Sequence, residues 1–177
     1  QVANRHIAAA YDDEAALAEL AAICDVVTYE FENVPVAAAR TLGGKLPVFP
    51  PERALEVAQD RLVEKTFLNG IGISTARFKP VDDDRQLAEG LLAFGGSGVL
   101  KTRRLGYDGK GQRVFRGIEA GSVSGTFAAM GNVPLILEAL VPFEREISVI
   151  AARGRDGSFA AKPDLIYLTR TELEGLF

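Results

Sequence analysis

Residues 101–112 restrict the possible folds of this chain more than any other segment, because three glycines and several cations share one short turn. Residues 98–100 before it and 113–115 after it have the composition of short strands, so the pattern predicts a β-hairpin with a glycine-rich turn. Glycines let backbone N–H groups approach an anion, and the cations supply positive charge. The cations are Lys101, Arg103, Arg104 and Lys110. The predicted ligand is phosphate, and the alternative is a solvated basic hairpin that protects a sheet edge.

Composition limits the kinds of partner and of metal ion that the chain can be expected to bind. The net charge of −4 over 177 residues argues against nucleic acid as the main partner, so the basic hairpin is a local feature. The single cysteine, Cys24, excludes an internal disulfide framework and suits the cytoplasm. With one histidine, His6, the chain favours a hard cation such as Mg²⁺ over zinc. No apolar run approaches the length of about 18 residues that a membrane span needs.

The first third of the chain alternates strand and helix patterns. A β-branched run at 26–29 leads into Glu30, Glu32 and Asn33, and a helix at 36–42 and a short strand at 48–49 follow. This order predicts a parallel sheet of an α/β fold, in which ligands bind beyond the carboxyl ends of strands. Glu30 and Glu32 are therefore candidate ligand-binding residues. The alternative is a solvent-facing acidic turn with Asn33 as a helix cap.

A helix is predicted from Glu52 to Gly70, with a break near residues 59–60. Arg61 and Lys65 share one face of it, and their spacing alone indicates ordinary surface charges that pair with carboxylates. After a linker at 70–74 the patterns predict a small α+β unit over residues 75–138. Its elements are a strand at 75–81, a helix at 84–94, the basic hairpin, a weak helix at 122–130 and a strand at 135–138. A further strand at 146–152 leads to a tight turn at 153–158.

Four groups of motifs together resemble the ATP-grasp ligases, and among them the family of 5-(carboxyamino)imidazole ribonucleotide synthases of purine biosynthesis. The motifs are DVVTYEFENVP at 25–35, QDR at 59–61 with Lys65, KTRRLGYDGKGQ at 101–112, and Glu138 with FEREISV at 143–149 and ARGRDG at 152–157. The likeness spans residues 1–161 in family order.

The resemblance implies a partial ATP-grasp fold in three parts. Residues 1–72 would complete the N-terminal pre-ATP-grasp α/β domain, and residues 73–138 would form the lid subdomain. Residues 139–177 would begin the C-terminal grasp subdomain, with a tail from residue 162 that departs from the family pattern. We therefore expect the chain to be an internal fragment of a longer protein.

The resemblance also implies roles for individual residues. Lys101 would reach the nucleotide phosphates, and Arg61 would contact the nucleotide from the preceding helix. A lid loop would close over the phosphates, formed by Gly106, Tyr107, Asp108, Gly109, Lys110, Gly111 and Gln112. The predicted catalytic residues are Lys101, Tyr107, Asp108 and Lys110.

The remaining roles concern the adenosine and the second substrate. A hinge at Glu138, Ala139, Leu140 and Val141 would read the adenine edge through backbone groups, and Glu146 would bind the ribose hydroxyls. Residues implied to face the ribonucleotide are Glu30 or Glu32, Tyr107, Asp108 and Lys110.

The implied reaction converts ATP, bicarbonate and 5-aminoimidazole ribonucleotide to ADP, phosphate and the N-carboxylated product. Magnesium would be required, with its ligands expected beyond the end of this chain, and a homodimer would be the assembly. We expect turnover to need the full-length parent. Two alternatives stay open: a non-catalytic ATP-grasp-like protein that binds nucleotide weakly or binds only a protein partner, and another ATP-grasp ligase such as the formate-dependent purine transformylase. The YEFEN motif at 29–33 suits the transformylase less well.

Overall fold

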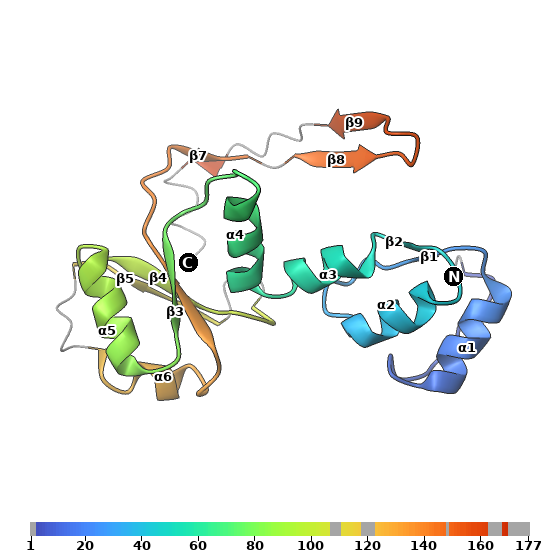
Figure 1. Cartoon of the computed structure of the whole chain (residues 1–177). Helices are drawn as coiled ribbons and strands as arrows, with labels where there is room; N and C mark the ends of the chain where they lie inside the picture. The colour runs from blue at the N-terminus through green and yellow to red at the C-terminus, as the bar shows by residue number, and fades with distance from the viewer. Residues whose placement is uncertain (1–2, 107–110, 118–122, 148, 163–167, 170–177) are drawn as a thin grey trace. The chain divides into compact units, whose positions relative to one another are not determined.

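The computed structural model describes residues 3–106, 111–117, 123–147, 149–162 and 168–169. The chain divides into two compact units, Gln1–Ala139 and Leu140–Phe177, and each is described by itself (Figure 1). In the part of the chain that the structure describes, no helix has both the length and the apolar character needed to cross a membrane.

The first unit opens with alternating helices and strands. These are α1 (Glu14–Ile23), β1 (Val27–Thr28), α2 (Val36–Gly43), β2 (Val48–Phe49) and α3 (Glu52–Ala58). Asp13 caps α1, because its carboxylate accepts a hydrogen bond of 2.9 Å from the backbone N–H of Ala16. Strands β1 and β2 pair in parallel, as the order of strand and helix patterns predicted. The acidic turn of residues 30–33 therefore leaves the carboxyl end of a parallel strand.

The predicted break near residues 59–60 is confirmed. Helix α3 ends at Ala58 and α4 (Arg61–Gly70) begins shortly after it. Asp60 is the N-cap of α4, and its Oδ1 accepts hydrogen bonds from the backbone N–H groups of Leu62 at 2.9 Å and Val63 at 3.3 Å. A side chain that satisfies free N–H groups in this way stabilises a helix start.

A four-stranded antiparallel sheet forms the rest of the first unit, in the order β3-β6-β4-β5. Its strands are β3 (Phe78–Val81), β4 (Gly98–Thr102), β5 (Gln112–Phe115) and β6 (Leu135–Glu138). The predicted hairpin is confirmed, because Lys101 pairs with Gln112 and Gly98 with Phe115. The helices are α5 (Asp84–Ala93), capped by Asp83, and the single turn α6 (Thr126–Ala129). Asp84 of α5 caps α6, since it accepts from Gly125 N at 2.5 Å and Phe127 N at 2.7 Å.

The core of this unit lies between α5 and one face of the sheet (Figure 1). Leu100, Leu137 and Phe115 come from three adjacent strands and pack against Leu87 and Leu91 of α5. Each fully buried side chain of this size contributes about 1.5–3 kcal/mol. The helix approaches closely because Gly90 has no side chain: a Cβ atom there would lie 2.7 Å from Leu137 Cδ2.

The opposite face of the sheet has polar side chains on its two central strands, β4 and β6. Side chains alternate along a strand, so Lys101 points away from the core that contains Leu100. Val99 pairs with Glu138 and Lys101 pairs with Ile136, which places Lys101 and Glu138 diagonally on the same face. Long side chains at diagonal positions can contact each other.

The second unit contains two antiparallel strand pairs. Strand β7 (Arg145–Glu146) pairs with β10 (Leu168–Thr169), and β8 (Ile150–Arg153) pairs with β9 (Phe159–Lys162). The predicted tight turn between β8 and β9 is present, and Gly154 N donates to Ser158 O at 2.8 Å. The predicted single strand over residues 146–152 is wrong, because β7 and β8 have different partners and alternation does not show where a strand changes partner.

Candidate functional site

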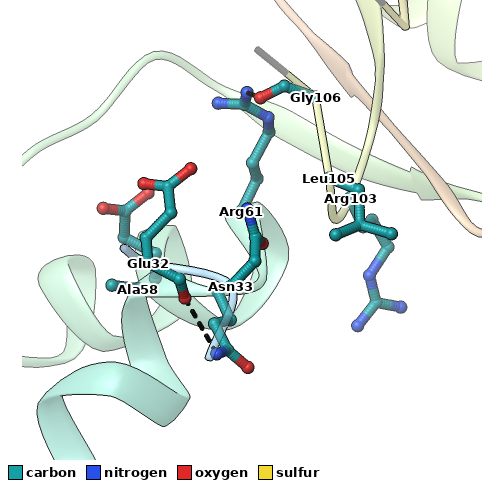
Figure 2. Close-up of a pocket in the computed structure, with 9 residues that line it drawn as sticks. Glu32, Asn33, Ala58, Arg61, Arg103, Leu105 and Gly106 are labelled. Atoms are coloured by element: carbon teal, nitrogen blue, oxygen red, sulfur yellow. Dashed lines mark hydrogen bonds between the residues drawn. The ribbon is translucent and has the colours of Figure 1, made fainter. Parts of the chain in front are cut away.

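A polar cavity of about 160 Å³ lies where three distant segments of the first unit meet (Figure 2). The turn after β1 contributes Glu32 and Asn33. The junction of α3 and α4 contributes Ala58, Gln59, Arg61 and Glu64, and the segment that follows β4 contributes Arg103, Leu105 and Gly106. The acidic motif, the QDR motif and the start of the glycine-rich loop therefore line one cavity.

Gln59 holds the acidic turn and the end of β4 together. Its side-chain amide donates to the carbonyl oxygens of Glu32 at 2.8 Å and Val34 at 2.6 Å. Its Oε1 accepts from Arg104 Nη2 at 2.6 Å. The residue is only 8% exposed, so these bonds have little competition from water. Gln59 thereby fixes the position of Glu32 relative to the basic hairpin.

Asp60 links the start of α4 to the same hairpin. Arg103 forms a salt bridge of 2.7 Å with its Oδ2, in addition to the capping bonds to α4. Burial by itself raises the pKa of the Asp60 carboxyl, but the hydrogen bonds from Arg103, Val63 and Leu62 and the charge of Arg103 outweigh it. The pKa of Asp60 is therefore lower than its usual value.

Arg61 extends from α4 toward the glycine-rich loop. Its Nη2 donates to the carbonyl oxygen of Gly106 at 3.0 Å, and Figure 2 shows the side chain reaching that atom. Its backbone N–H donates to the carbonyl oxygen of Arg103, also at 3.0 Å. The expected pairing with a carboxylate is confirmed for Lys65, which forms an ion pair with Glu138, but both side chains are partly buried and not freely exposed surface charges.

Lys101, Lys65 and Glu138 form a second cluster on the polar face of the sheet. Lys101 Nζ lies 3.0 Å and Lys65 Nζ 3.5 Å from the same carboxylate oxygen, Oε2 of Glu138. The cluster thus joins α4, β4 and β6. It contains the lysine predicted to reach phosphates and the first residue of the predicted hinge.

The other predicted residues divide by position. Both Glu30 and Glu32 are exposed, but only Glu32 is among the residues that line the cavity. Gly111 has a φ of +70°, a conformation that favours glycine, and its carbonyl oxygen accepts from Thr102 N at 2.8 Å. Gln112 lies opposite Lys101 in the β4–β5 hairpin.

The structure does not test the roles predicted for several other residues. Tyr107, Asp108, Gly109 and Lys110 lie outside the described residues. Ala139 ends the first unit, and its N–H donates to Arg77 O at 2.8 Å. Leu140, Val141 and Glu146 belong to the second unit, with Glu146 in β7. The roles assigned to these residues stay predictions.

The sequence analysis assigned no role to Gln59 or Asp60, and it expected Arg103 to supply positive charge to a phosphate. In the structure Arg103 pairs with Asp60 instead, and Gln59 and Asp60 carry hydrogen bonds that join the start of α4 to the acidic turn and to the segment after β4. One signal was present: an aspartate directly after a helix break is typical of an N-cap. No local pattern indicates that the same carboxylate binds an arginine 43 positions later.

Magnesium was expected from the resemblance. Among the residues described by the structure, no group of three histidine, cysteine, aspartate or glutamate side chains could hold a metal ion.

Comparisons with known proteins agree with the motifs. Residues 1–59 match the ribonucleotide synthetase preATP-grasp domain, and residues 66–171 match the ATP-grasp domain. An N5-carboxyaminoimidazole ribonucleotide synthase from Brucella melitensis biotype 1 is 58% identical over 160 residues, which cover 90% of this chain and 44% of the relative.

Two solved structures are also similar. The N5-carboxyaminoimidazole ribonucleotide synthetase from Thermus thermophilus has a TM-score of 0.76 and 49% identity, over 86% of this chain and 40% of that one. The N5-carboxyaminoimidazole synthetase from Staphylococcus aureus, complexed with ADP, has a TM-score of 0.83 and 31% identity, over 90% of this chain and 42% of that one. The chain thus spans less than half the length of these relatives.

These matches confirm the predicted resemblance and the partial ATP-grasp fold. The ATP-grasp domain alone matches more than half of the chain. The chain therefore belongs to the ATP-grasp family.

Proposed function

We propose that this chain forms the nucleotide-binding and ribonucleotide-facing part of an ATP-dependent carbon–nitrogen ligase. The proposed reaction is the carboxylation of 5-aminoimidazole ribonucleotide by bicarbonate, with ATP converted to ADP and phosphate. The Brucella melitensis relative that supports it carries the name N5-carboxyaminoimidazole ribonucleotide synthase, and the Staphylococcus aureus structure contains ADP.

The observation that carries the proposal is the meeting of Glu32, Arg61 and Gly106 in one cavity. Glu32 belongs to the acidic motif that would face the ribonucleotide, and Gly106 begins the loop that would cover the phosphates. Arg61 donates to the carbonyl oxygen of Gly106, so α4 links the two regions. Because Glu32 lines the cavity and Glu30 does not, we assign Glu32 as the carboxylate nearer to the ribonucleotide.

The chemistry would proceed in two steps. A bicarbonate oxygen attacks the γ-phosphorus of ATP, the bond from that phosphorus to the bridging oxygen breaks, and ADP leaves. The carboxyphosphate formed is then attacked at its carboxyl carbon by the amine of the ribonucleotide, which loses a proton as phosphate departs. Catalysis of phosphoryl transfer consists mainly of positioning and of stabilising negative charge.

The cations of this chain fit those requirements. Lys101 would neutralise charge on the transferred phosphoryl group, and Arg61 would orient the nucleotide while it holds the start of the lid loop. Exclusion of water by a closed lid would protect carboxyphosphate from hydrolysis. The domain ranges given above, the homodimer and a cytoplasmic location are further parts of the proposal.

A chimera tests the proposal. In it, this chain replaces the matching 160 residues of the Brucella melitensis relative, which supplies the rest of the enzyme. We expect release of ADP that depends on both 5-aminoimidazole ribonucleotide and bicarbonate, and loss of this activity on Lys101→Ala or Glu32→Gln substitution. The unaltered relative is the control for assay conditions.

Two outcomes would contradict the proposal. ADP release that needs formate in place of bicarbonate would favour the transformylase alternative. A folded chimera that binds no ATP would favour a non-catalytic protein.

A further inference from the structure

The second cluster contains a carboxylate that the proposed chemistry does not use. Oε2 of Glu138 lies 3.0 Å from Lys101 Nζ and 3.5 Å from Lys65 Nζ. The side chains of Lys101, Lys65 and Glu138 are 25%, 17% and 10% exposed, so all three groups are largely removed from water. Charged side chains are costly to bury without partners, so the Glu138 carboxylate depends on the ammonium groups beside it.

The charges in this cluster do not balance. Two ammonium groups face one carboxylate, which leaves an excess of one positive charge on the polar face of the sheet. An additional anion would be attracted to that face, and the phosphates of a nucleotide are the anions that the proposed function supplies. This step rests on the proposed function.

The position of Lys65 affects the environment of Glu138 when Lys101 binds a phosphate. Had Glu138 only Lys101 as a partner, the movement of Lys101 to a phosphate would leave a largely buried carboxylate uncompensated. Breaking a buried ion pair in this way is destabilising, because it leaves a charge without compensation. Lys65 approaches the same oxygen from α4, a different element, so it can remain with Glu138 when Lys101 leaves.

We infer that Glu138 is the counter-ion of Lys101 before nucleotide binds, and that Lys65 is a positioning residue that holds Glu138 when Lys101 moves to the phosphates. Lys65 itself contacts no substrate in this account. It lowers the cost of releasing Lys101, so it strengthens the binding of phosphate-bearing nucleotides through Glu138.

A purely structural role for Lys65 is the alternative. In that case the Lys65–Glu138 pair only fixes α4 on the sheet, and loss of Lys65 reduces stability. The two roles differ in one respect: only the inferred role requires that the effect of Lys65 on ATP binding disappear when Glu138 has no charge.

The test is a double-mutant cycle on the 177-residue chain, with the dissociation constant for ATP measured by calorimetry. We expect Lys65→Met to weaken ATP binding by about tenfold, which corresponds to about 1.4 kcal/mol. Lys65→Arg keeps the positive charge and is expected to stay within about threefold of the wild type. In the Glu138→Gln background, Lys65→Met is expected to change the dissociation constant by less than about twofold, because neighbouring groups in one network are coupled.

Three results would overturn the inference. The first is a tenfold effect of Lys65→Met on the dissociation constant for ATP that persists in the Glu138→Gln background. The second is a loss of ATP affinity in Lys65→Arg equal to the loss in Lys65→Met. The third is unchanged ATP binding in Lys65→Met. Thermal unfolding of each variant shows which proteins are folded. If the Lys65→Met single variant is unfolded, the comparison of Glu138→Gln with the Glu138→Gln, Lys65→Met double variant tests the inference. Absence of ATP binding by the wild type would overturn the proposed function as well, whereas wild-type binding with an additive cycle would overturn only this inference.

Discussion

Arg103 donates to both carboxylate oxygens of Asp60, through Nε at 3.0 Å to Oδ1 and 3.1 Å to Oδ2 and through Nη2 at 2.7 Å to Oδ2. The same carboxylate caps α4. One side chain therefore joins the start of α4 to the end of β4. Because Arg61 follows Asp60 and Lys101 precedes Arg103 by two positions, this pair sets the relative positions of the two cations assigned to the nucleotide.

Removal of the Asp60 carboxylate should destabilise the chain more than removal of an ordinary helix cap. Asp60→Ala deletes the cap and leaves the largely buried Arg103 without its partner, so we expect a loss of about 3 kcal/mol in the free energy of unfolding. Asp83→Ala is the matched control, since Asp83 caps α5 and accepts from Gln86 N at 2.7 Å. That control should lose about 1 kcal/mol. Urea denaturation measures both, and equal losses would contradict the linking role of Asp60.

The contribution of Asp60 to the stability of the fold should depend on pH only under acidic conditions. Its pKa is lowered in the folded chain from the usual 3.8. A carboxyl with a lowered folded pKa contributes stability above its unfolded pKa and loses that contribution as the pH falls through the folded value. The stability difference between the wild type and Asp60→Asn should thus be constant near neutral pH and shrink below about pH 4. Denaturant midpoints between about pH 7 and about pH 3 measure this difference. A stability difference between the two proteins that stayed constant over that whole range would contradict the prediction.

Gly111 should resist substitution for two reasons. Its φ of +70° disfavours a side chain, and an added Cβ would lie 2.8 Å from Thr102 Oγ1. Gly117 has a φ of +62° with no atom within 4 Å of its added Cβ, so it isolates the first reason. We expect Gly117→Ala to lose about 1 kcal/mol and Gly111→Ala about 2 kcal/mol. Gly111→Ala should also weaken ATP binding, because it displaces the hairpin that contains Lys101. Chemical denaturation and calorimetry measure these effects, and identical stability losses would exclude a steric contribution at Thr102.

Gln59 should be required for the shape of the cavity. Gln59→Leu removes the donor to the carbonyl oxygens of Glu32 and Val34 and the acceptor for Arg104. We expect a loss of about 2 kcal/mol in stability, because buried polar groups lose their partners. Gln86→Leu is the control, since Gln86 accepts one side-chain bond, from Asp82 N at 2.9 Å, and should lose less than about 1 kcal/mol. In the chimera, Gln59→Leu should raise the KM for 5-aminoimidazole ribonucleotide more than the KM for ATP. The reverse order would contradict the assignment of the Glu32 turn to the ribonucleotide.

Much of the local structure of the first unit could be predicted from the sequence. The helix expected at 84–94 is α5, and the break between α3 and α4 follows from residues 59–60. These features depend on neighbours within a few residues, so propensity and capping rules are sufficient to find them.

The ion pairs of the site could not be predicted in the same way. Lys101 and Glu138 are 37 residues apart, and Asp60 and Arg103 are 43 apart. Their contacts depend on the register of β4 against β6 and on the placement of α4, which no local pattern determines. The family resemblance identified Lys101 and Arg61, but it gave no role to Lys65, Gln59 or Asp60. The missed division between β7 and β8 has a similar cause, because a change of strand partner is a long-range property.

The most direct test of the central claim is a titration of the 177-residue chain with labelled ATP, with Lys101→Ala and Lys79→Ala measured in parallel. Lys79 lies on β3 of the same sheet, is exposed and is opposite Leu137, so it controls for loss of a positive charge. We predict that Lys101→Ala weakens ATP binding by at least about tenfold, since it removes a charge-assisted bond to phosphate, and that Lys79→Ala leaves binding unchanged. Equal ATP affinity in the wild type and Lys101→Ala would contradict the assignment of this sheet face to the nucleotide.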